Sequence, residues 1–261
     1  MKYALVIEYD GSSFSGWQRQ SHASTVQECV EHAISKVANH EIGIACAGRT
    51  DAGVHALAQV VHFETNVLRS KRSWILGINS NLPATIVIKN IIPVDENFHA
   101  RFSAHARTYR YMINNEPVRS ALLAQRATWE RVPLDEKRMS DGAEYLVGEH
   151  DFTSFRALAC QAHSPVRHIH HLTVAREGSM LTIDVKANGF LHHMVRNLAG
   201  VLMSIGRREH DEDWALEVLE AKDRALAGVT APAQGLYFMA VDYDEKYAIN
   251  RFGVLEDDDT H

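Results

Sequence analysis

The sequence has few cysteines and no long apolar run. Only three cysteines occur among 261 residues, and they stand far apart at Cys29, Cys46 and Cys160. An odd number at such spacing gives no disulfide framework and no paired metal-binding motif. No stretch stays apolar over the length of a membrane helix, and the acidic Glu8 and Asp10 come too early for a signal peptide. We therefore expect a cytoplasmic protein with no membrane partner.

Acidic residues are missing from two segments, although the chain as a whole has a net charge of −6. Residues 209–261 contain 14 acids and 4 bases, which leaves 19 acids and 23 bases in residues 1–208. Within that larger part, Thr65–Val94 and Lys186–Arg208 each contain four bases and no acid. A local basic surface can bind nucleic-acid phosphate whatever the total charge. Solvated surface charge without a partner is the alternative for either segment.

Residues 1–106 predict a βαββαβ unit. Alternating or apolar runs bounded by turn residues indicate strands, and apolar residues at helical spacing indicate helices. Thr25 followed by Glu28 forms a capping-box pattern, and Ser70 can cap the second helix. The expected strands are Lys2–Tyr9, Ile42–Cys46, Leu57–Phe63 and Thr85–Ile92.

Residues 107–245 predict the same order with one added helix. We expect Asp135 to open a helix that Gly148 ends, and Asp211 to cap the last helix. The other expected elements are strands at Arg107–Asn114, Arg167–Ala175, Leu181–Ala187 and Gly235–Tyr243, and a helix at Leu191–Gly206. Residues 246–261 form an acidic tail, of which Glu256–His261 is expected to be disordered.

The predicted fold class is therefore α+β. Two ferredoxin-like (βαββαβ) halves would place antiparallel sheets side by side with helices on one face. The open faces of the two sheets would then join into a basic cleft between the halves, where we expect the chemistry. Neither half repeats the residues of the other, so any duplication shows only in the order of the elements.

The segment Ala47–Ala56, with the sequence AGRTDAGVHA, lies between two of these strands. A glycine on each side of Arg49-Thr50-Asp51 allows a sharp turn and a close approach by another chain or a ligand. Loops held between rigid strands often carry functional side chains. The alternative is that Asp51 caps its own turn through its carboxylate.

This segment resembles the active-site loop of the tRNA pseudouridine synthases of the TruA family. The resemblance extends, in the same order, through four further motifs along nearly the whole chain. These motifs are Arg107-Thr108-Tyr109-Arg110-Tyr111, Asp151-Phe152-Thr153-Ser154-Phe155-Arg156, Gly189-Phe190-Leu191-His192-His193-Met194-Val195-Arg196-Asn197 and Gly235-Leu236-Tyr237.

The resemblance implies roles for four residues. Asp51 matches the catalytic nucleophile, and Arg196 matches the basic residue that would orient its carboxylate and keep it charged. Tyr109 matches the active-site tyrosine, whose ring could stack on a flipped uracil. Arg49 would fill the space left by the flipped nucleotide or hold its phosphate. Structural alternatives remain: a solvated helix arginine at Arg196, strand packing at Tyr109, and a loop-stiffening salt bridge at Arg49.

The implied reaction converts uridine to pseudouridine in the anticodon arm of tRNA, at positions 38, 39 and 40, by a homodimer. It requires no metal and no small-molecule cofactor. The 16 histidines include a cluster around His168–His171 and His192-His193, yet no HExxH or paired-cysteine spacing accompanies them. His170 and His171 would moreover point to opposite faces of a strand. Two other functions stay open on the residues alone: a non-enzymatic RNA-binding module, and a hydrolase that uses Asp51 as its nucleophile.

Overall fold

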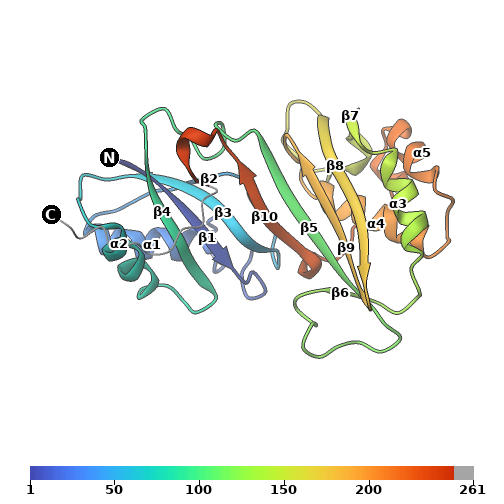
Figure 1. Ribbon diagram of the computed structural model, residues 1–261, viewed down its shortest axis with the longest axis horizontal. Coiled ribbons are helices and arrows are strands. Elements are labelled where there is room, and N and C mark those ends of the chain that lie inside the picture. The colour runs from blue at the N-terminus through green and yellow to red at the C-terminus, as the bar shows by residue number, and fades with distance from the viewer. Residues whose placement is uncertain (250–261) are drawn as a thin grey trace. The chain divides into compact units, whose positions relative to one another are not determined.

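The structure, a computed structural model, describes residues 1–249 and divides into two compact units. The first unit holds Met1–His105 and the chain from Phe238 onward, and the second holds Ala106–Tyr237. Each unit combines a mostly antiparallel sheet with helices (Figure 1), which confirms the α+β class. The expected disordered end, Glu256–His261, lies outside the described residues. No helix within residues 1–249 is long and apolar enough to cross a membrane.

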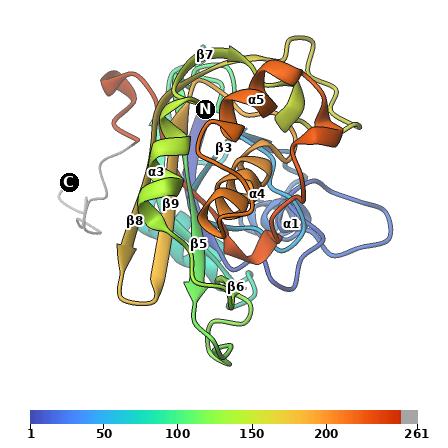
Figure 2. The same ribbon diagram turned by 90° about the vertical axis from the view of Figure 1, so that its right-hand side faces the viewer.

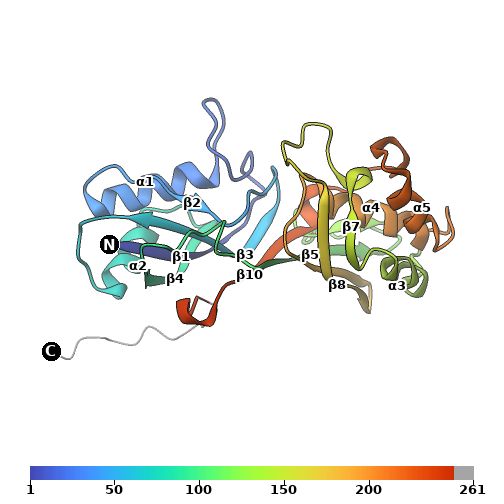
Figure 3. The same ribbon diagram turned by 90° about the horizontal axis from the view of Figure 1, so that it is seen from above.

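The first unit has the strand order β4-β1-β3-β10, and a short strand β2 pairs with β3. The aromatic rings of Tyr3, Phe63 and Trp74 pack together between the sheet and helix α2, while α1 runs along one side of the strands (Figure 3). In chain order the elements are β1 (Lys2–Tyr9), α1 (Val26–Ala38), β2 (Ala45–Cys46), β3 (His55–Glu64), α2 (Lys71–Asn79), β4 (Ile86–Val94) and β10 (Leu236–Asp242).

Two local predictions for the first unit are wrong. Thr25 is the residue before α1, but its buried hydroxyl makes no capping hydrogen bond. The first N–H groups of the helix, on Val26 and Gln27, instead donate to the carbonyls of Gly16 and Trp17. The strand expected at Ile42–Cys46 shortens to β2, because side chains of α1 accept the hydrogen bonds of Ile42 N and Ile44 N. Ser70 caps α2 as expected and accepts from Ser73 N.

The second unit has the strand order β5-β9-β8-β7, and β6 pairs in parallel with β5. Helices α4 and α5 lie on the same side of strands β8, β9 and β5 (Figure 2). Its elements are β5 (Ala106–Asn115), β6 (Thr128–Glu130), α3 (Glu136–Glu144), β7 (Gly148–Asp151), β8 (Val166–Glu177), β9 (Met180–Ala187), α4 (Met194–Gly206) and α5 (Trp214–Ala221).

Several boundaries in the second unit differ from the prediction. Asp135 caps α3, but the helix ends at Glu144, and Gly148 begins the short strand β7, which the sequence analysis did not predict. Asp211 does not cap α5, because the residue before the helix is Asp213; the Asp211 carboxylate accepts a hydrogen bond from Arg138 Nη2 at 2.8 Å. The α5 helix begins instead at Trp214.

The last strand joins a different unit from the one expected. The pattern assigns Gly235–Tyr243 to the second half, whereas the chain from Phe238 onward, which includes most of β10, belongs to the first unit. Tyr243 reinforces this placement, because its hydroxyl donates to Ala100 O at 2.6 Å. The chain stays ordered past residue 245: Tyr247 is buried and its ring packs against Phe98. The described part of the expected acidic tail is therefore folded.

Candidate active site

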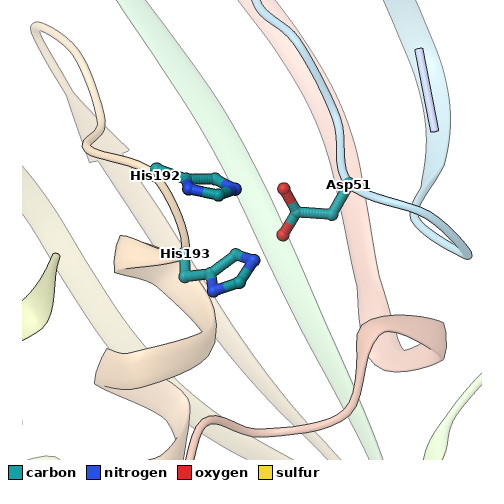
Figure 4. Close-up of side chains that lie close together, drawn as sticks. All are labelled: Asp51, His192 and His193. Carbon is teal, nitrogen blue, oxygen red and sulfur yellow. The ribbon is translucent and has the colours of Figure 1, made fainter. Parts of the chain in front are cut away.

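Asp51 lies in the connection between β2 and β3, where its side chain is half-buried (Figure 4). Backbone hydrogen bonds hold the turn: Val54 N donates to Asp51 O at 3.2 Å, and Gly53 N donates to Phe14 O. Gln59 Nε2 also donates to Gly48 O at 2.6 Å. These hydrogen bonds hold the main chain of the loop and do not involve the carboxylate of Asp51.

The neighbouring residue Thr50 ties the loop to the core of the first unit. Its buried hydroxyl shares a 2.8 Å hydrogen bond with the hydroxyl of Tyr9, and its carbonyl accepts from Trp17 N at 3.0 Å. Burial raises the pKa of Tyr9, against the effect of the Thr50 hydrogen bond, so the phenol stays protonated. No local pattern in the sequence indicates that Thr50 and Tyr9 are partners, because 41 residues separate them.

Two glycines have conformations that this loop requires. Gly53 has a φ of +78°, in the left-handed region that glycine adopts without strain. Gly16 has a φ of +92°, and a Cβ there would lie 2.9 Å from Thr50 O and 3.1 Å from Ala52 N. The segment that contains Gly16 therefore approaches the loop closely enough to fix the backbone on both sides of Asp51.

Arg49 has an exposed side chain, and within residues 1–249 it makes no ion pair. The loop-stiffening salt bridge considered for this residue is thus not formed in the described part of the chain. Burial raises the pKa of the Cys46 thiol to about 11, and the charge of Arg49 acts in the opposite direction. The Arg49 guanidinium therefore lies near the end of β2.

Arg196 lies in the first turn of α4 and is half-buried. Its Nε donates to Ala231 O at 2.8 Å, and Ala231 N donates back to Arg196 O at 3.1 Å. The first bond ties the guanidinium group to the backbone at Ala231, and the second joins the backbones of the same two residues. The side chain is therefore held in place and is not a freely solvated helix arginine.

The next residue, Asn197, was not identified from the sequence. It is fully buried, and its Nδ2 donates to Phe155 O at 2.7 Å. Its Oδ1 accepts from Thr230 Oγ1 at 2.7 Å and from Arg224 Nη2 at 3.1 Å. The sequence does contain one indication of this role, because Asn197 is a polar residue within the apolar pattern of α4. This network connects the start of α4 to the segment Thr230-Ala231, which also accepts the hydrogen bond of Arg196.

Tyr109 lies on β5 with its ring buried against Phe190, at a centroid distance of 5.0 Å and nearly perpendicular. Tyr111 shares its face of the strand, as the alternation predicts, and its hydroxyl bonds to Thr128 Oγ1 and Pro232 O. Both tyrosines therefore contribute to packing. The expected contact of Tyr109 with a uracil stays a prediction.

Histidines precede α4 and lie along β8. His192 and His193 are side by side, with ring centroids 4.0 Å apart, and His193 has a φ of 63° (Figure 4). In β8 a bulge between Ile169 and His171 leaves both His170 and His171 exposed. The two therefore do not alternate between faces in the way we expected from a regular strand.

The family model described as "tRNA pseudouridine synthase" matches residues 5–103 and 143–244, which together make up most of the chain. The chain therefore belongs to the tRNA pseudouridine synthase family, whose members are isomerases that act on tRNA.

Curated relatives named tRNA pseudouridine synthase A match over almost their full lengths. The protein of Colwellia psychrerythraea is 52% identical over 257 residues, covering 98% of this chain and 99% of its own. That of Nitrosococcus oceani is 54% identical, with 96% and 97% covered, and that of Escherichia coli K12 is 53% identical, with 94% and 91% covered. Among solved structures, a chain from the crystal structure of a Cbf5-Nop10-Gar1 complex matches with a TM-score of 0.32 and 11% identity, covering 77% of this chain and 54% of that chain.

Proposed function

We propose that this protein converts uridine to pseudouridine in the anticodon stem-loop of tRNA, at positions 38, 39 and 40, with Asp51 as the nucleophile. The tRNA substrate is that of the relatives named above, and the positions follow from the resemblance of the loop motif. By the same resemblance we propose a cytoplasmic homodimer. Light scattering would measure the dimer against the chain mass of 29.3 kDa.

The reaction is an isomerisation, and its atoms balance without a co-reactant. The bond between ribose C1′ and uracil N1 breaks, and a bond between C1′ and uracil C5 forms. The hydrogen on C5 leaves as a proton, and N1 takes up a proton. A carboxylate can assist by adding to the ribose or to the ring and leaving again in a later step.

The observation that carries this proposal is the way the Asp51 loop is built. The backbone on both sides of Asp51 is fixed by hydrogen bonds to Phe14, Trp17 and Gln59, and the side chain stays half-buried rather than enclosed. A carboxylate held on a rigid, accessible loop suits a nucleophile, because little ordering remains to be done when the substrate binds.

Three other residues complete the proposal. Arg196, whose Nε donates to Ala231 O, supplies the positive charge that keeps the nucleophile ionised. Tyr109, whose ring packs against Phe190, stacks on the flipped uracil. Arg49, with its exposed side chain, contacts the phosphate of the flipped nucleotide or occupies the space that the nucleotide leaves.

The function is tested with tRNA that carries tritium at uracil C5. Pseudouridine formation replaces the bond from C5 to hydrogen with a bond from C5 to C1′, so the protein should release tritium to water. An RNA-binding module and a hydrolase would both leave the label on the uracil. Absence of release from a correctly folded tRNA substrate would refute the proposal.

A further inference from the structure

Phe102 exposes 76% of its surface, next to the exposed Arg101. A single exposed apolar side chain needs no explanation in itself. Here, however, the two residues lie in a connection of the first unit whose backbone is held by hydrogen bonds. The guanidinium carbon of Arg101 lies 5.6 Å from the centroid of the Phe102 ring, within the range of a cation–π contact.

His99 fixes the backbone of both residues. Its Nδ1 accepts from Arg101 N at 3.1 Å and from Phe102 N at 3.3 Å. The turn is closed by Ser103, whose N–H donates to His99 O at 2.9 Å and whose Oγ accepts from His99 N at 3.0 Å. Arg101 and Phe102 are thus presented on a preformed turn.

The core of the unit anchors this turn. Ala100 is fully buried; its N–H donates to His62 Nδ1 at 3.1 Å, and its carbonyl accepts from the hydroxyl of Tyr243. Phe98, also fully buried, packs against the ring of Tyr243 at 5.2 Å. Residues on both sides of His99 are therefore held inside while Phe102 faces out.

The exposed surface combines flat uncharged rings with a cation. The His99 ring lies 4.4 Å from that of Phe102 and is tilted by 33°. Burial, together with the charges of Lys2 and Arg101, lowers the pKa of His99, so its ring is neutral at neutral pH. Aromatic rings that stack on bases, next to a cation that contacts the backbone, are how proteins bind unpaired nucleotides.

The same surface lies near the Asp51 loop within the first unit. The charges of Arg101 and Arg49 both act on the Cys46 thiol, so both guanidinium groups lie near the end of β2, five residues before Asp51. Two exposed arginines at this point favour a negatively charged partner. A phosphate-bearing nucleotide fits both the charge and the exposed ring.

We propose that Phe102 stacks on an unpaired base of the tRNA and that Arg101 contacts a phosphate next to that base. The inference rests on the proposed function, which makes tRNA the substrate. It adds a binding contact outside the Asp51 loop and the residues of α4. The preformed turn reduces the ordering that binding has to overcome.

The test compares Phe102→Ala, Phe102→Trp and Arg101→Ala in filter binding of tRNA and in tritium release. Phe102→Ala should weaken tRNA affinity about tenfold, while Phe102→Trp should stay within about twofold of wild type because an indole also stacks. Arg101→Ala should lower the slope of log K against log salt by about one, whereas Phe102→Ala should leave the slope unchanged. Leu122→Ala, at a side chain 90% exposed in the second unit, is the control and should bind like wild type.

The outcomes separate this inference from the proposed function. Wild-type affinity for Phe102→Ala, with tritium release by the wild type intact, would refute the stacking contact and leave the function standing. It would then favour an apolar protein partner for Phe102. Failure of the wild type to release tritium would refute the function, while a tenfold loss of binding in Phe102→Ala would still support the RNA contact. An unchanged melting temperature shows that each variant is folded.

Discussion

At the scale of single residues, local sequence predicted Asp51 and its loop but not the groups that hold it. The turn at Gly53 follows from local pattern, because a glycine there adopts a positive φ. The hydrogen bond between Thr50 and Tyr9 joins residues 41 positions apart, and no periodicity encodes such a contact. The turn at Arg101 and Phe102 could not be predicted for the same reason, because it depends on contacts with His62 and Tyr243, which are distant in sequence.

His62 gives a pH-dependent test at this scale. Burial, aided by His99 and Lys2 and opposed by Glu64, lowers its pKa from 6.5 to about 4. The unfolded chain thus takes up this proton near pH 6.5 and the folded chain only near pH 4. His62 should therefore make its full contribution to the free energy of unfolding above pH 6.5, and this contribution should fall as the pH drops towards 4. His62→Asn keeps an acceptor for Ala100 N. Between pH 7 and 5, the free energy of unfolding of this variant should fall by about 1 kcal/mol less than that of the wild type, after allowance for the partial exposure of His62.

Urea unfolding at several pH values measures this difference, and His22→Asn, at an exposed histidine of the same unit, is the control. The control should follow the wild-type curve. Identical pH dependence in His62→Asn and wild type would show that His62 does not titrate as the structure indicates.

At the scale of elements, periodicity predicted the buried face of α4, but not the residue where the helix begins or the hydrogen bonds that hold it to other segments. Met194, Leu198 and Leu202 are buried as their spacing predicts. The helix begins at Met194 rather than at Leu191, because His193 has a left-handed conformation. Asn197 links α4 to segments around residues 155 and 230, and contacts of this kind depend on tertiary structure.

Asn197→Ala tests this fastening. The substitution leaves the carbonyl of Phe155 and the donors of Arg224 and Thr230 without their buried partner, which should lower the free energy of unfolding by about 2–4 kcal/mol. Asn97→Ala, at an exposed asparagine, should change it by less than about 0.5 kcal/mol. Chemical denaturation of both variants makes the comparison, and equal stability would contradict a structural role for the network.

At the scale of the whole molecule, the sequence predicted the α+β class because strand alternation and helical spacing are local properties. It did not predict that the last strand joins the first unit, since pairing of β10 with β3 connects distant parts of the chain. The uneven distribution of charge is also a local property of the sequence: Thr65–Val94 and Lys186–Arg208 contain no acid, and the last fifth of the chain is acidic.

Salt dependence tests whether this charge separation serves RNA binding. Lys71 and Arg72 lie in the first turn of α2, where glutamates suit the helix dipole, so Lys71→Glu with Arg72→Glu should leave the fold intact. The double variant should bind tRNA more weakly and reduce the slope of log K against log salt by about two. Lys137→Glu, outside both basic segments, is the control. A slope equal to that of wild type would remove this helix from the RNA-binding surface.

The central claim, that Asp51 is the nucleophile, is tested by Asp51→Asn. Asparagine has nearly the same shape but no negative charge, and the backbone partners of the loop at Phe14 and Gln59 remain. Tritium release and tRNA affinity are measured on the same preparation, with Asp95→Asn as an exposed control in the same unit. The account predicts release below detection, with melting temperature and affinity within about twofold of wild type. Release within about tenfold of wild type would contradict the catalytic role of Asp51.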